Sequence, residues 1–182
     1  MIVPFSNFYF QIPVSIFYHP SSVTDSNEDL QELLNKAYFY LKFRPRSKKE
    51  VADYLLKKIK KRHWSTDDVD KVIKQLEEQN LINDKEFVSW FVEQRNASKP
   101  KSQFVLRGEL LRFGIDKDVI DNFFMEHEEP EDGLALKALQ SRWRRFSALP
   151  KKERFAKSAA FLSRRGFSFD LIRKTISKLE EK

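Results

Sequence analysis

The chain has 182 residues, of which 41% are hydrophobic and 34% charged, and its 4 glycines and 7 prolines argue against a β-rich fold with many tight turns. The absence of cysteine excludes disulfides, thiolate metal ligands and cysteine nucleophiles. The net charge is +7; because residues 1–35 hold four acids and no Lys or Arg, residues 36–182 carry +11. A basic body favours nucleic acid, an acidic protein surface or an anionic membrane as partner.

Residues 1–28 form an extension that differs from the rest of the chain. They are rich in Phe and Tyr, and Ile12, Val14 and Ile16 alternate weakly with their neighbours. This pattern predicts an extended arm or a short strand, although three prolines disfavour a central strand. We expect neither a secretory signal nor a membrane span, because a basic leading region and a run of about 20 apolar residues are both missing.

From residue 29 onward, apolar residues recur with the period of a helix. We predict nine helices and no sheet over residues 29–181. Ser47 and Glu50 have the spacing of a capping box at the start of the second helix, and Ser65 is the expected N-cap of the third. Pro150 suits the start of the eighth helix, because proline lacks the N–H that would be unpaired there.

Three short junctions indicate an internal repeat: His63-Trp64-Ser65, Gly114-Ile115-Asp116 and Gly166-Phe167-Ser168. Each joins a helix terminator, one apolar residue and an N-cap residue. We therefore predict an all-α fold of three tandem three-helix repeats, spanning residues 29–82, 83–129 and 130–182, in a curved, elongated array. The central apolar residues should be buried, and Gly114 and Gly166, with His63 in the same place, should have positive φ.

The sequence offers little support for an enzyme. The three histidines, His19, His63 and His127, are far apart, and no glycine-rich phosphate loop is present. We expect no catalytic residue, no cofactor and no metal site. The tryptophans Trp64, Trp90 and Trp143 could stack on nucleic-acid bases, but they lie on apolar stripes and we assign them to the core.

Basic residues are concentrated in two segments, 42–62 and 137–165, and the second contains Glu153 as its single acid. For the lysines of residues 57–61 a solvated helix face is the preferred interpretation. Arginine is different, because its planar fork binds two oxygens of a phosphate or carboxylate. Arg44, Arg95 and Arg145 recur at spacings of 51 and 50. Their shared role can be partner binding or structural pairing with carbonyls or acids, and both interpretations stay open.

Several short runs resemble the RecX regulatory family. They are Ala37-Tyr38 with Leu41 and Arg44-Pro45-Arg46-Ser47, Leu81-Ile82-Asn83-Asp84 with Phe87, Trp90 and Arg95, Glu109-Leu110 with Gly114-Ile115, and Leu162-Ser163-Arg164-Arg165-Gly166-Phe167. Their order covers roughly residues 30–180. Asn83, Phe113 and the run Lys99-Pro100-Lys101-Ser102 depart from the family pattern, which puts contacts of the middle repeat in doubt.

The resemblance implies a partner. RecX proteins bind RecA, usually as its filament on single-stranded DNA, and limit ATPase and strand-exchange activity. We therefore expect a cytoplasmic monomer that acts in homologous recombination, DNA repair and the SOS response, with weak direct DNA contact left open. The alternative is a helical-repeat protein that binds DNA without RecA, since two helices of each repeat resemble a helix-turn-helix. The expected contact residues are Arg44, Arg46, Arg95, Lys99, Lys101, Arg142, Arg144, Arg145, Arg164 and Arg165.

Overall fold

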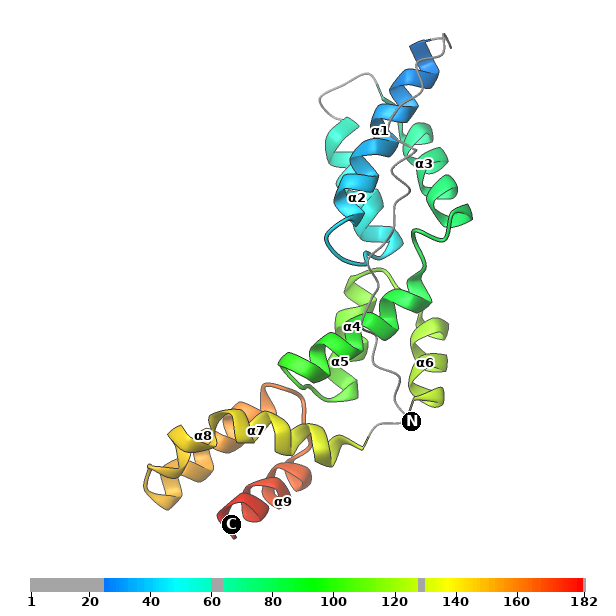
Figure 1. The fold of residues 1–182 in the computed structure, drawn as a ribbon. Helices are drawn as coiled ribbons and strands as arrows, with labels where there is room; N and C mark the ends of the chain where they lie inside the picture. The colour runs from blue at the N-terminus through cyan, green and yellow to red at the C-terminus, as the bar shows by residue number, and fades with distance from the viewer. Residues whose placement is uncertain (1–24, 60–63, 128–129, 182) are drawn as a thin grey trace. The chain divides into compact units, whose positions relative to one another are not determined.

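The computed structural model describes residues 25–59, 64–127 and 130–181, and over these ranges it contains nine α-helices and no strand (Figure 1). This confirms the predicted all-helical fold. The helices are α1 Asp25–Leu41, α2 Lys48–Ile59, α3 Thr66–Glu78, α4 Asp84–Ser98, α5 Gln103–Arg112, α6 Lys117–Glu126, α7 Glu131–Ser147, α8 Lys151–Ser163 and α9 Phe169–Glu180.

The first helix begins at Asp25, four residues before the predicted start at residue 29. Residues 25–28 are polar and carry no apolar period, so the pattern that identified the rest of the helix could not detect them. The arm or strand predicted for the start of the chain otherwise falls on residues 1–24, which lie outside the described residues.

Side-chain caps fix the starts of several helices. Ser47 and Glu50 form the predicted capping box: the Glu50 amide donates to Ser47 Oγ at 3.2 Å, and the Ser47 amide donates to Glu50 Oε2 at 3.3 Å. Ser65 forms a second box with Asp68. Asp116, in contrast, is the N-cap of α6 but forms no side-chain cap bond in the described part of the chain. Each satisfied cap supplies a partner to a backbone N–H that the helix leaves unpaired.

Each successive triplet of helices encloses its own apolar core: α1–α3, α4–α6 and α7–α9, which we call repeats 1, 2 and 3. The junction residues Trp64, Ile115 and Phe167 are 6%, 2% and 4% exposed, so their predicted burial is confirmed. Trp90 and Trp143 are half-buried and pack against the cores of repeats 2 and 3, as expected.

The glycine junctions of repeats 2 and 3 end their helices in the same way. Gly114 has φ 78° and Gly166 has φ 85°, which confirms the predicted left-handed residues. The following amides donate back across the turn, Ile115 N–H to Leu110 O at 3.2 Å and Phe167 N–H to Leu162 O at 3.4 Å. This is the bond pattern of a glycine-terminated helix. The matching prediction for His63 falls outside the described residues.

The chain divides into two compact units, Met1–Asn83 and Asp84–Lys182. The second unit contains repeats 2 and 3, which are directly bonded: the Ser102 amide donates to Arg165 O at 2.9 Å, and Arg165 Nη1 donates to Pro100 O at 2.8 Å. Gly166 fits closely here, since an added Cβ would lie 2.4 Å from both Ser102 Oγ and Val105 Cγ2. The start of α5 therefore rests on the turn between α8 and α9.

Candidate protein and nucleic-acid interface

In repeat 1, the two predicted contact arginines are held by one internal acid. Arg44 binds Glu50 with both nitrogens of its fork, at 2.6 and 3.2 Å, while Arg46 Nη1 lies 3.3 Å from Glu50 Oε1. The Arg46 guanidinium also lies 4.0 Å from the centre of the Tyr40 ring. Glu50 also caps α2, so this cluster fixes the turn between α1 and α2. The Glu50 carboxylate compensates part of the positive charge of the two arginines.

In repeat 2, two more of the predicted residues share an acid. Arg95 Nε lies 3.0 Å from Glu109 Oε2, and Lys101 Nζ pairs with the other oxygen of the same carboxylate. The Arg95 guanidinium lies over Phe91, 4.8 Å from the ring centre. Lys99 is exposed and forms no ion pair within the described part of the chain. The end of α4 is thus linked to the middle of α5.

Repeat 3 places three of the predicted arginines around one groove between α7 and α8. The groove has a volume of about 530 Å³. It is lined by Arg142, Arg145 and Phe146 of α7, by Leu149 of the turn that follows, and by Lys157, Ala160, Phe161 and the C-cap Arg164 of α8. Phe146 and Phe161 meet edge to face with their centres 5.9 Å apart. Cationic heads therefore surround an apolar floor.

The charges of this groove are largely uncompensated. Lys157 pairs with Glu153 at 2.7 Å. Arg142, Arg145 and Arg164 are exposed and have no ion pair or side-chain hydrogen bond among the described residues. Arginine forks bind phosphate and carboxylate oxygens in pairs, and an apolar floor weakens the competition from water. The groove is therefore suited to an anionic ligand.

The remaining two predicted residues of repeat 3 have different surroundings. Arg144 is exposed on α7 but does not line the groove. Arg165 is half-buried: besides its bond to Pro100 O, it lies over Phe161 at 4.5 Å from the ring centre. Burial, and then the nearby Arg142 guanidinium, lower the pKa of Arg165 from its ordinary value. Arg165 thus links repeats 2 and 3, whereas its neighbour Arg164 lines the groove.

Sequence inspection missed Lys157 and the apolar floor as parts of this site. A signal was present, because Lys157, Ala160, Phe161 and Arg164 follow the spacing i, i+3, i+4, i+7 and must share one face of a helix.

Within the described residues, no group of three or more His, Asp or Glu side chains is placed to hold a metal ion. None of the described helices is both long and apolar enough to cross a bilayer.

Comparison with known proteins identifies relatives that match about 85% of the chain. Two domain models match, "RecX, third three-helix domain" over residues 130–176 and "RecX, first three-helix domain" over residues 34–76. The protein "Regulatory protein RecX" of Prosthecochloris aestuarii is 30% identical over 156 residues, which cover 85% of this chain and 97% of that protein. The protein of the same name from Bacillus subtilis is 31% identical over 157 residues, but the match covers only 57% of its length.

Two solved structures share the fold. The crystal structure of RecX from Lactobacillus salivarius matches with a TM-score of 0.65 at 24% identity, covering 86% of this chain and 99% of that one. A second crystal structure, described as "regulatory protein RecX", matches with a TM-score of 0.66 at 21% identity, covering 88% of this chain and 82% of that one.

Proposed function

The chain belongs to the RecX family of regulatory proteins, and on this premise we propose that it binds RecA, as the filament that RecA forms on single-stranded DNA, and inhibits its ATPase and strand-exchange activities. Binding would occur in the cytoplasm, with the chain acting as a monomer in homologous recombination and repair. The role needs no chemical step, because a ligand that favours one filament state over another is sufficient to shift the population.

The observation that carries this proposal is that the arginines of repeats 1 and 2 pair with acids of their own repeat, whereas those of the repeat 3 groove do not among the described residues. Arg44 and Arg95 bind acids of their own repeats. Arg142, Arg145 and Arg164 have no such partner within the described residues and share one groove. Like charges held together on a surface repel one another, so an anionic partner relieves a cost that the protein carries when alone. Repeat 3 is thus the strongest candidate for contact with the filament.

The anion can belong to RecA or to DNA, and the two differ in their salt dependence. A contact with DNA phosphate releases condensed counterions, and each such contact contributes roughly one unit to the slope of log affinity against log salt. A contact with a RecA carboxylate releases no condensed counterions and should change that slope less. Filament binding measured over a range of salt therefore identifies the anion.

The test is a pair of double charge reversals matched in net charge. Arg142→Glu with Arg145→Glu changes two residues that line the groove, while Arg144→Glu with Lys152→Glu changes two exposed residues outside it. Binding to RecA filaments assembled on oligo(dT) would be followed by fluorescence anisotropy. Hydrogen bonds to charged groups contribute about 1.5–3 kcal/mol each, so the groove variant should bind roughly a hundredfold more weakly or worse.

The affinity of the control variant should stay within a few-fold of the wild-type affinity, because this variant changes the net charge of the protein but leaves the groove intact. Both variants should keep the wild-type melting temperature, because none of the four side chains forms an ion pair in the described structure. If both variants weaken filament binding equally, binding depends on net charge alone, and a specific role for the groove is contradicted. Tight binding to naked DNA without any effect on RecA would favour the direct DNA-binding alternative.

A further inference from the structure

Helix α5 has two apolar faces, and only one of them is buried. Leu106 and Leu110 are 1% and 0% exposed and belong to the core of repeat 2. Phe104 and Leu111 are 80% and 52% exposed, and together with Gly108 they follow the spacing i, i+4, i+7 on another face. A surface helix normally needs one apolar stripe, and a second one indicates a second contact.

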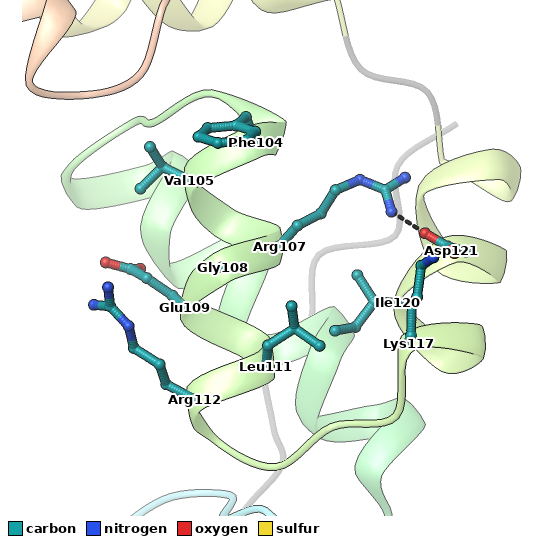
Figure 2. A pocket seen from close by; sticks show the side chains of 10 residues that line it. All are labelled: Phe104, Val105, Arg107, Gly108, Glu109, Leu111, Arg112, Lys117, Ile120 and Asp121. Carbon is teal, nitrogen blue, oxygen red and sulfur yellow. Dashed lines mark hydrogen bonds and ion pairs between the residues drawn. The ribbon is translucent and has the colours of Figure 1, made fainter.

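This second face borders a groove of about 570 Å³ between α5 and α6, shown in Figure 2. Ile120 of α6 is 2% exposed and lies opposite Leu111, while Phe104 and Val105 line the end near the start of α5. A Cβ built on Gly108 would meet no atom of the described residues within 4 Å. Glycine is a poor helix former compared with alanine, and no packing among the described residues explains its presence here.

The acids on the rim of this groove are already compensated. Asp121 pairs with Arg107, whose guanidinium also lies 4.7 Å from the centre of the Phe124 ring, and the dashed line in Figure 2 marks this pair. Glu109 binds Arg95 and Lys101. Lys117, at the start of α6, is exposed and has no ion pair among the described residues. The rim therefore presents positive charge beside apolar surface.

We propose that the α5–α6 groove is a docking site for an amphipathic helix of a protein partner. The partner helix would place apolar side chains between Phe104 and Leu111, bring its backbone close to α5 at Gly108, and pair an acidic residue with Lys117. Glycine permits such close approach because it has no side chain. Nucleic acid fits the α5–α6 groove less well than the arginine groove of repeat 3, because the most exposed side chains of the α5–α6 groove, Phe104 and Leu111, are apolar. The inference rests on the proposed function, with RecA as the partner.

The experiment substitutes leucine at two helical glycines, at each of which an added Cβ would meet no described atom within 4 Å. Gly108→Leu fills the α5–α6 groove, and Gly133→Leu adds the same side chain on α7 outside it. Neither change should lower the melting temperature, because leucine is the better helix former. Gly108→Leu should weaken binding to RecA filaments on oligo(dT) at least tenfold, as expected for the centre of an interface, while Gly133→Leu leaves it unchanged.

A second variant tests the chemistry of the occupant. Lys117→Glu should weaken filament binding by about tenfold, and Lys117→Arg should retain it. If Gly108→Leu and Lys117→Glu bind as tightly as the wild type, the docking site is refuted while the proposed function stands. If Gly108→Leu instead abolishes a self-associated form of the chain in sedimentation and leaves filament affinity unchanged, the occupant is a second copy and the inference is overturned. A wild-type chain that fails to bind any RecA filament would refute the proposed function itself.

Discussion

Replacing Gly166 with alanine should destabilise the second unit through two separate effects. The first is backbone strain: Gly166 has φ 85°, and a residue with a Cβ loses about 1–2 kcal/mol in this left-handed conformation. The second is a clash, because the new Cβ would lie 2.4 Å from Ser102 Oγ and from Val105 Cγ2. Forcing extra volume into a packed contact typically costs about 1–3 kcal/mol.

One opposing effect reduces the sum. Alanine restricts the unfolded chain more than glycine does, and this contributes about 0.4–1 kcal/mol of stability. The expected net loss in the free energy of unfolding is therefore about 2–4 kcal/mol. Gly114→Ala is the natural comparison, since Gly114 has φ 78° and is exposed, and there we expect a loss of about 1 kcal/mol.

Urea unfolding at 25 °C, followed by far-UV circular dichroism, measures both losses. Both glycines lie in the second unit, and Gly166→Ala should give the larger loss. Gly166 follows α8 but contacts Ser102 and Val105 at the start of α5, so this substitution also disturbs the contact between repeats 2 and 3. In a Val105→Ala background, the cost of Gly166→Ala should shrink, since one of the two clashing atoms is gone. A Gly166→Ala cost no greater than that of Gly114→Ala would show that the two repeats do not meet at this glycine.

Three further predictions concern stability. Ser158→Ala should raise the free energy of unfolding by about 1 kcal/mol in urea titrations, because Ser158 Oγ is fully buried and has no hydrogen-bond partner among the described residues; a loss would mean that the hydroxyl is satisfied. Trp64→Ala should cost about 3–5 kcal/mol in the first unit, since it empties a buried site and removes the 3.0 Å bond from Trp64 Nε1 to Asp29 O; a change under 1 kcal/mol would contradict the burial. Hydrogen bonds from the Ser65 amide and hydroxyl, then Lys71, lower the pKa of Asp68, so its stabilisation should be full above about pH 4 and lost as pH falls through the lowered pKa. Asp68→Ala should flatten this part of the acid-unfolding curve, and an unchanged curve would refute the cap's contribution.

The fold was predictable because its signals are local and repeated. The helical spacing of apolar residues is enough to place Leu33, Leu55 and Leu76 on the buried faces of their helices, and all three are fully buried. The glycine junctions were also predictable, because a glycine that follows a helical pattern commonly takes the left-handed conformation that ends a helix, as Gly114 and Gly166 do. Asn80 has φ 55° after α3 and escaped notice, because asparagine is a weaker signal of that conformation than glycine.

The candidate interface was only partly predictable, because side-chain pairing depends on tertiary contacts. The recurrence of Arg44, Arg95 and Arg145 suggested one shared role, but Arg44 binds Glu50 and Arg95 binds Glu109. Counting charges could not distinguish these two arginines from Arg145, which has no ion pair among the described residues. The α5–α6 groove escaped prediction for a related reason: Leu111 is as apolar as Leu110, and only the packing of α6 shows which of them is exposed.

The most direct test of the proposed function is a titration of this chain into a RecA strand-exchange reaction with ATP hydrolysis followed in parallel. Both activities should fall together as the chain saturates the filament. The Arg142→Glu, Arg145→Glu variant should need a much higher concentration for the same effect, and the Arg144→Glu, Lys152→Glu variant should match the wild type. Unchanged rates of strand exchange and hydrolysis, at concentrations where the chain is seen to coat RecA filaments, would contradict regulation of RecA by this protein.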